Sequence, residues 1–210
     1  MKAQSSENPL IRATQRCLNL LFKACNETVL FPLRFSYLTA IVTPHIKKES
    51  TVLDVGAARG RLAKTIQAQR KINCIGIDTH LQPNPLIPVI QYDGQNFPFH
   101  DKSFDCVLII DVLHHTQSPD KVIKEAKRVA RDTILVKDHY WETALDHLLL
   151  RWADEIGNRP YGIQRQYNYL KLKSWQRLFE KNGLSIISSK KFRYNPFDPC
   201  KHVFFKLNVE

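Results

Sequence analysis

One stretch, TVLDVGAARG at residues 51–60, constrains this chain more than any other. Its first half is apolar and rich in β-branched residues, which predicts a buried strand. Gly56 and Gly60 then bracket a turn that leads into a helical pattern. Glycine adopts positive φ angles at little cost and lets a ligand approach the backbone, while a helix N-terminus offers N–H groups without partners. The stretch therefore predicts a strand, a ligand-binding turn and a helix.

The glycine spacing differs from that of a dinucleotide-binding turn, in which a third glycine lies three positions after the second. Here Gly60 is followed by Arg61 and by no later glycine in the turn. Asp54 precedes Gly56 by two residues, and a carboxylate at that point repels a pyrophosphate but attracts a cation. We therefore expect a ligand that has no phosphates and carries a positive charge.

Three further acids follow apolar segments in the order typical of a doubly wound sheet. Asp78 ends INCIGID, Asp93 ends VIQYD, and Asp111 follows FDCVLII. An acid at the end of the second strand is suited to accept hydrogen bonds from ribose hydroxyls. Asp93 alone is a weak sign, because Asp-Gly is also a common turn pair. The four acids in register predict a nucleoside-containing ligand at the carboxyl edge of the sheet.

In these residues the chain resembles class I S-adenosylmethionine (SAM) methyltransferases, and among them the methyltransferase type-11 domain group. The segment FPFHDKSFDCVLIIDVLHHT extends the resemblance through the fourth strand. The resemblance implies that SAM is the cofactor, with its methionine part at the glycine turn, its ribose at the second strand and its adenine at the third. The residues that would bind it are Asp54, Gly56, Ala58, Gly60, Asp78, Asp93 and Asp111.

The order of elements predicts an α/β fold: a Rossmann-like, doubly wound, mostly parallel sheet with a C-terminal antiparallel strand hairpin and an N-terminal helical extension. SPDKVIKEAKRVAR is expected to be a helix with Ser118 as its N-cap. The proline-rich segment between the second and third strands predicts an extended connection in place of a helix. Strands are expected at about 51–55, 73–77, 88–92, 104–110 and 132–137, and in LSIISSKKF and HVFFKLNVE.

A chain of 210 residues is long enough for one good core. We expect an N-terminal helical extension at 1–48, a SAM-binding methyltransferase domain at 49–210, and a lid over the acceptor at about 141–172. The amphipathic helices of the extension would pack on the core, cap the cofactor cleft or make peripheral contact with a membrane. No apolar run approaches the length of a transmembrane segment, so none is predicted.

Five cysteines are scattered without a C-x-x-C pair, which indicates neither a zinc site nor a disulfide framework. No metal site is predicted, and a cytoplasmic location is expected. Most of the net charge of +11 lies after residue 120. This excess fits an anionic acceptor or RNA, and it equally fits a solvated basic face.

Methyl transfer from a sulfonium is an in-line displacement in which the enzyme mainly aligns the donor and the acceptor. Asp111 and His115 follow the fourth strand, and His139 lies at the matching edge of the fifth. These three are the candidate catalytic residues, with either histidine as the base. Each histidine could instead be a hydrogen-bonded structural residue.

A small-molecule or lipid-like acceptor is the preferred interpretation. The proline pair of nucleic-acid N-methyltransferases is absent after the fourth strand, and Cys200 is expected in the terminal hairpin, away from the ligand edge. Asp111 and Lys137 match only half of the lysine, aspartate, lysine, glutamate set of ribose methyltransferases. An RNA methyltransferase that uses the basic C-terminal half, and a non-catalytic SAM-binding scaffold, remain the alternatives.

Overall fold

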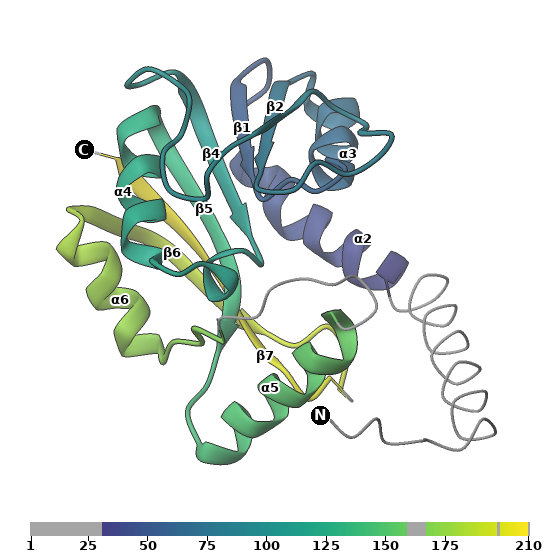
Figure 1. Ribbon diagram of the computed structural model, residues 1–210, viewed down its shortest axis with the longest axis vertical. Coiled ribbons are helices and arrows are strands. Elements are labelled where there is room, and N and C mark those ends of the chain that lie inside the picture. Colours follow the sequence, from purple (N-terminus) through teal and green to yellow (C-terminus); the bar gives the residue numbers. More distant parts are fainter. Residues whose placement is uncertain (1–30, 159–166, 197, 210) are drawn as a thin grey trace, which may run out of the picture.

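The computed structural model describes residues 31–158, 167–196 and 198–209, and they form a seven-stranded sheet of order β3-β2-β1-β4-β5-β7-β6 (Figure 1). Strands β1 to β5 pair in parallel, whereas β7 runs antiparallel to both β5 and β6. The predicted Rossmann-like sheet with an antiparallel C-terminal hairpin is confirmed. The strands are β1 (Thr51–Val55), β2 (Asn73–Asp78), β3 (Val89–Gln91), β4 (Phe104–Ile110), β5 (Ala130–Tyr140), β6 (Leu184–Phe192) and β7 (Lys201–Val209).

Helices cover both faces of the sheet (Figure 1). On one face lie α2 (Phe31–Val42) and α3 (Arg61–Arg70), and on the other α4 (Pro119–Val129) and α6 (Leu172–Lys181). A fifth helix, α5 (Ala144–Asn158), lies beyond the carboxyl ends of the parallel strands. This arrangement confirms the doubly wound topology, in which ligands bind outside the carboxyl ends of the strands.

Two hydrophobic clusters, one on each face, hold these layers together. The first joins the sheet to α4 and α6 and includes Ile123, Trp175 and Phe179. The second joins it to α2 and α3 and includes Val42 and Ile66. A central parallel strand is buried on both faces, and β1 and β4 are accordingly largely apolar on both, with Asp54 and Asp105 as the charged exceptions.

Several local predictions are also confirmed. α4 begins directly after Ser118 at the N-cap position, although the Ser118 side chain makes no capping hydrogen bond. Residues 79–88 and 94–103 contain no helix. β5 is longer than expected because β7 pairs with it as far as Tyr140. Residues 1–30 of the expected N-terminal helical extension lie outside the described residues.

The boundary at residue 48 and the lid at 141–172 stay predictions. α2 packs its last residue, Val42, into the same core cluster as Phe204 of β7. The two ends of the lid segment lie together, because Leu170 forms a bridge with Tyr140. Within the described residues, no helix has the length and apolar character needed to cross a membrane.

Candidate functional site

The turn after β1 requires glycine at both of its ends. Gly56 and Gly60 have φ angles of 68° and 70°. A Cβ atom at Gly56 would lie 2.5 Å from Cγ2 of Val112, and one at Gly60 would lie 2.2 Å from Cγ1 of Ile87. The turn is fixed to β2 by a hydrogen bond from the Gly56 N–H to the Ile77 carbonyl. Neighbouring side chains therefore pack directly on the backbone of this turn, which leaves no room for a side chain at either glycine. Binding of a ligand at the turn stays a prediction.

Asp78 lies beside this turn at the end of β2. Its Oδ2 accepts a 2.8 Å hydrogen bond from the Ala58 N–H, and its Oδ1 accepts one from the His80 N–H. Ala58 has a φ angle of 48°. This left-handed conformation is unfavourable for any residue that carries a Cβ atom. The bond to Asp78 stabilises that conformation, and together they define the rim of the candidate cofactor site.

Asp54 is the buried acid of the candidate cofactor site. It is only 5% exposed. Burial, with a smaller contribution from Asp78, raises the pKa of Asp54 to about 7. A cation bound beside Asp54 would favour its charged form and lower that pKa again. The carboxylate is therefore suited to a positively charged ligand, and its contact with one stays a prediction.

Asp93 has a different local role. Its Oδ1 accepts hydrogen bonds from the backbone N–H groups of Gln95 and Asn96, both at 2.7 Å, and its Oδ2 accepts one from the Asn96 side chain. These bonds shape the loop that follows β3. Contact between Asp93 and an adenine stays a prediction.

Asp111, directly after β4, is the centre of an ion-pair cluster. Arg34 of α2 donates to its Oδ2 at 2.7 Å, and the buried Lys137 of β5 pairs with its Oδ1. Burial alone would raise the pKa of Asp111, but Lys137 and then Arg34 outweigh it and hold the pKa well below its usual value. Asp111 is thus a permanent carboxylate between two cations.

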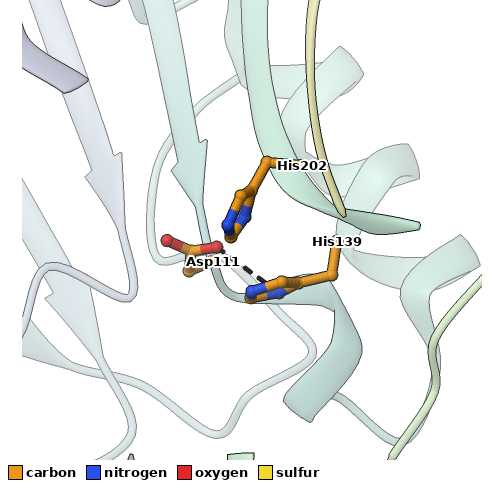
Figure 2. A group of neighbouring side chains, drawn as sticks. All are labelled: Asp111, His139 and His202. Atoms are coloured by element: carbon orange, nitrogen blue, oxygen red, sulfur yellow. Dashed lines mark ion pairs between the residues drawn. The ribbon is translucent and has the colours of Figure 1, made fainter. Parts of the chain in front are cut away.

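Two histidines point toward Asp111 from neighbouring strands, His139 from β5 and His202 from β7 (Figure 2). Nδ1 of His139 lies 3.7 Å from Oδ1 of Asp111. Burial, and next the charge of Lys137, lowers the pKa of His139 to about 4. His139 is therefore neutral at pH 7, and its lone pair can accept a hydrogen bond, although the low pKa makes it a weak base.

A second pair, whose formation the sequence did not predict, joins His114 after β4 to Asp138 near the end of β5. The His114 Nδ1 lies 2.6 Å from the Asp138 Oδ1, and both side chains are almost completely buried. The ring of His115 packs against that of His114 at an angle of 46°, with ring centroids 3.9 Å apart, and its role as a base stays a prediction. The polar run Lys137, Asp138 and His139 at the end of an apolar strand was the signal that could have identified this pair.

The antiparallel direction of β7 corrects one expectation. Cys200 was expected away from the ligand edge, and this is wrong. Its neighbour Lys201 pairs with Tyr140, so the start of β7 lies beside the end of β5. Cys200 is buried next to Leu150 and Tyr169. No sequence signal identified His202, because its position depends on this strand pairing.

Comparisons with known proteins agree with this geometry. A family model described as a methyltransferase domain matches residues 31–189. An uncharacterized protein of Methanocaldococcus jannaschii is 36% identical over 84 residues, which are 38% of this chain and 38% of that protein. A tRNA U34 carboxymethyltransferase of Nautilia profundicola is 28% identical over 140 residues, which are 61% of this chain and 44% of that protein. The chain thus spans less than half the length of these curated relatives.

A solved structure of similar fold is the 1,6-didemethyltoxoflavin-N1-methyltransferase of Burkholderia thailandensis, crystallised with 1,6-didemethyltoxoflavin and S-adenosylhomocysteine. The match has a TM-score of 0.67 at 14% identity and covers 100% of this chain and 93% of that one. At this identity the likeness shows the fold. The family model, in contrast, matches well over half of the chain. This protein therefore belongs to the methyltransferase domain family, the class I SAM-dependent methyltransferases.

Proposed function

We propose that this protein transfers the methyl group of SAM to a small-molecule acceptor, which could be lipid-like or anionic. The observation that carries the proposal is the direct adjacency of two structures at one sheet edge. Asp54 lies in β1, and the glycine turn follows that strand. The cluster around Asp111 follows β4, the strand that pairs with β1. A cofactor at the turn would present its methyl group toward the cluster.

The burial of the cluster supports a small acceptor. Lys137, Asp138, His114 and His202 are all buried, and His139 is only 12% exposed. A macromolecule could reach side chains at this depth only by extruding a single nucleotide or side chain, whereas a small molecule can be enclosed whole. Neutral His139 would orient an acceptor hydroxyl or amine by accepting a hydrogen bond from it, and Lys137 would stabilise negative charge on an acceptor oxygen.

Calorimetric titration with SAM tests the cofactor half of the proposal. Asp78→Ala should weaken SAM binding at least about tenfold, because two ribose hydroxyls would lose a charged acceptor. Asp132→Ala is the matched control, since Asp132 lies at the opposite end of β5 and pairs with Lys47. The absence of SAM binding by the wild type, or equal losses in both variants, would contradict the proposal.

Transfer of a labelled methyl group from SAM tests turnover and the acceptor class together. Incubation with separated lipid, polar small-molecule and RNA fractions should label the lipid or the small-molecule fraction. Label in none of the fractions, despite SAM binding, would favour a non-catalytic scaffold. Label in RNA alone would overturn the small-molecule assignment.

RNA is the second candidate acceptor because exposed cations lie along α4 and α6. These include Lys124 on α4 and Lys173 and Arg177 on α6, and the two helices cover the same face of the sheet (Figure 1). The tRNA U34 carboxymethyltransferase among the relatives also favours this alternative. If RNA is the acceptor, Arg177→Glu should weaken RNA binding, and binding should fall steeply with salt. Salt-independent binding would contradict it.

A further inference from the structure

Three side chains of the kinds that bind metals meet at the acceptor side of the site, although they come from different strands. Asp111 follows β4, His139 lies near the end of β5, and His202 lies near the start of β7 (Figure 2). One ligating atom of each lies within 4.8 Å of the others. Ligating atoms around a tetrahedral metal ion are about 3.3 Å apart, so small side-chain rotations would bring these three into range.

Both imidazoles have a buried nitrogen without a hydrogen-bond partner. Nδ1 of His139 and Nδ1 of His202 make no hydrogen bond to any described residue. Buried polar atoms in folded proteins nearly always have a partner, and each exception requires an explanation. A cation that binds both lone pairs would supply the missing partner.

The orientation of His202 gives a second, independent indication. Its Nε2 lies 2.9 Å from Oδ2 of Asp198. This hydrogen bond places the ring proton on Nε2 and leaves the lone pair on Nδ1, the nitrogen without a partner. Carboxylates orient metal-binding histidines in the same way, through the nitrogen that does not bind the metal.

We infer that Asp111, His139 and His202 bind a divalent first-row transition-metal ion such as Zn²⁺ or Fe²⁺. Two histidines and one carboxylate are a ligand set that such ions favour, and it leaves coordination positions open. An acceptor hydroxyl bound at an open position would lose its proton more readily. The sequence expectation of no metal site rested on cysteine spacing, which does not report on these three residues.

Lys137 is the competitor of the ion, because its ammonium group pairs with Oδ1 of Asp111. Arg34 holds the other oxygen, Oδ2. A divalent ion on Asp111 would be repelled by the charge of Lys137 across a few ångströms of protein interior. Lys137→Met removes this charge and keeps a side chain of similar length, so it should bind the ion at least about tenfold more tightly.

The test is calorimetric titration of the chelator-treated full chain with Zn²⁺, without SAM or an acceptor. The wild type should bind one ion. His202→Asn should weaken binding at least about thirtyfold, and Asp198→Asn about tenfold, because it removes the residue that orients the ring. His100→Asn is the control for adventitious binding, since His100 is exposed and is not one of the three ligands. Co²⁺ bound to the wild type should show visible absorption that His202→Asn removes.

Two results would overturn the inference. One is the absence of saturable one-to-one Zn²⁺ binding by the wild type, and the other is equal affinity in the wild type and His202→Asn. If His202→Asn does not fold, Lys137→Met decides, because an unchanged or weaker affinity contradicts the site. The measurement needs neither cofactor nor acceptor, so its failure would leave the proposed methyl transfer untouched.

Discussion

The two halves of the ligand edge are held together in different ways. At the cofactor half, Asp78 accepts hydrogen bonds from the backbone N–H groups of Ala58 and His80. At the acceptor half, Asp111 pairs with the side chains of Arg34 and Lys137. The hydrogen bonds of Asp78 require only the local path of the backbone. The ion pairs of Asp111 require side chains that the tertiary structure brings together from other elements.

The halves also differ in where charge is neutralised. In the acceptor half, Asp111 is neutralised by Lys137 and Arg34, and Asp138 is hydrogen-bonded to the ring of His114. In the cofactor half, the raised pKa of Asp54 shows a buried acid that its surroundings do not compensate. The cofactor half therefore favours a cationic ligand, whereas the charge of Asp111 in the acceptor half is already compensated by Lys137 and Arg34. The following predictions test this difference.

The largest effect is expected from Gly60→Ala, which tests the cofactor half. A Cβ atom there would lie 2.2 Å from Ile87, and the φ angle of 70° adds strain. Together these should lower the free energy of unfolding by about 4 kcal/mol. Gly94→Ala is the control, because Gly94 also has a positive φ but meets Thr79 only at 3.2 Å. Urea denaturation that shows equal losses in both variants would contradict the packing argument.

Asp138→Asn should have the next largest effect, and it tests the acceptor half. Asp138 is fully buried and accepts hydrogen bonds from the His114 ring and from the His139 N–H. Loss of its charge should lower the free energy of unfolding by about 3 kcal/mol. Asp101→Asn is the control, since Asp101 is 75% exposed and pairs with Arg128 at the surface. A loss below about 1 kcal/mol for Asp138→Asn would mean that such pairs do not hold this half together.

Asp54→Asn should change the pH dependence of stability. The folded pKa of Asp54, about 7, lies above its ordinary value of 3.8. As pH rises between these values the unfolded chain releases the proton first, so the wild type loses stability relative to the variant. From about pH 5 to about pH 7 this difference should grow by about 2 kcal/mol. Urea denaturation of both proteins across this range measures it, and a constant difference would show that Asp54 titrates normally.

The smallest effect is expected from Ala58→Gly. Ala58 has a φ angle of 48°, which glycine adopts without the steric cost of a Cβ atom. The variant should be more stable by about 1 kcal/mol, provided that the bond from its N–H to Asp78 remains. The neighbouring Ala57→Gly, at a buried residue without a positive φ, should instead lose stability. Thermal unfolding distinguishes the two, and a loss in both would show that Ala58 is not strained.

The sequence predicted the fold and the cofactor half because their signals are local. Buried parallel strands require continuous apolar runs, and a glycine turn with an acid at the end of the next strand lies within about 30 residues. Asp54, Gly56, Gly60 and Asp78 therefore emerged from the pattern alone, and their roles toward SAM stay predictions.

The acceptor half could be predicted only in part because its contacts are distant in sequence. Arg34 lies 77 residues from Asp111, and Lys137 lies 26 residues from it. His202 reaches the same place only because β7 enters the sheet between β5 and β6. Asp111 and His139 were found as polar residues at strand ends, but nothing local indicated which residues would partner them.

The insertion of β7 between β5 and β6 has a consequence for how the protein is made. A nascent chain can complete β1 to β4, and with them the glycine turn, long before residue 200 leaves the ribosome. Until then β5 has an open edge, and the imidazole of His202 is missing from its neighbours. The residues of the cofactor half are therefore all synthesised before the last residue of the acceptor half.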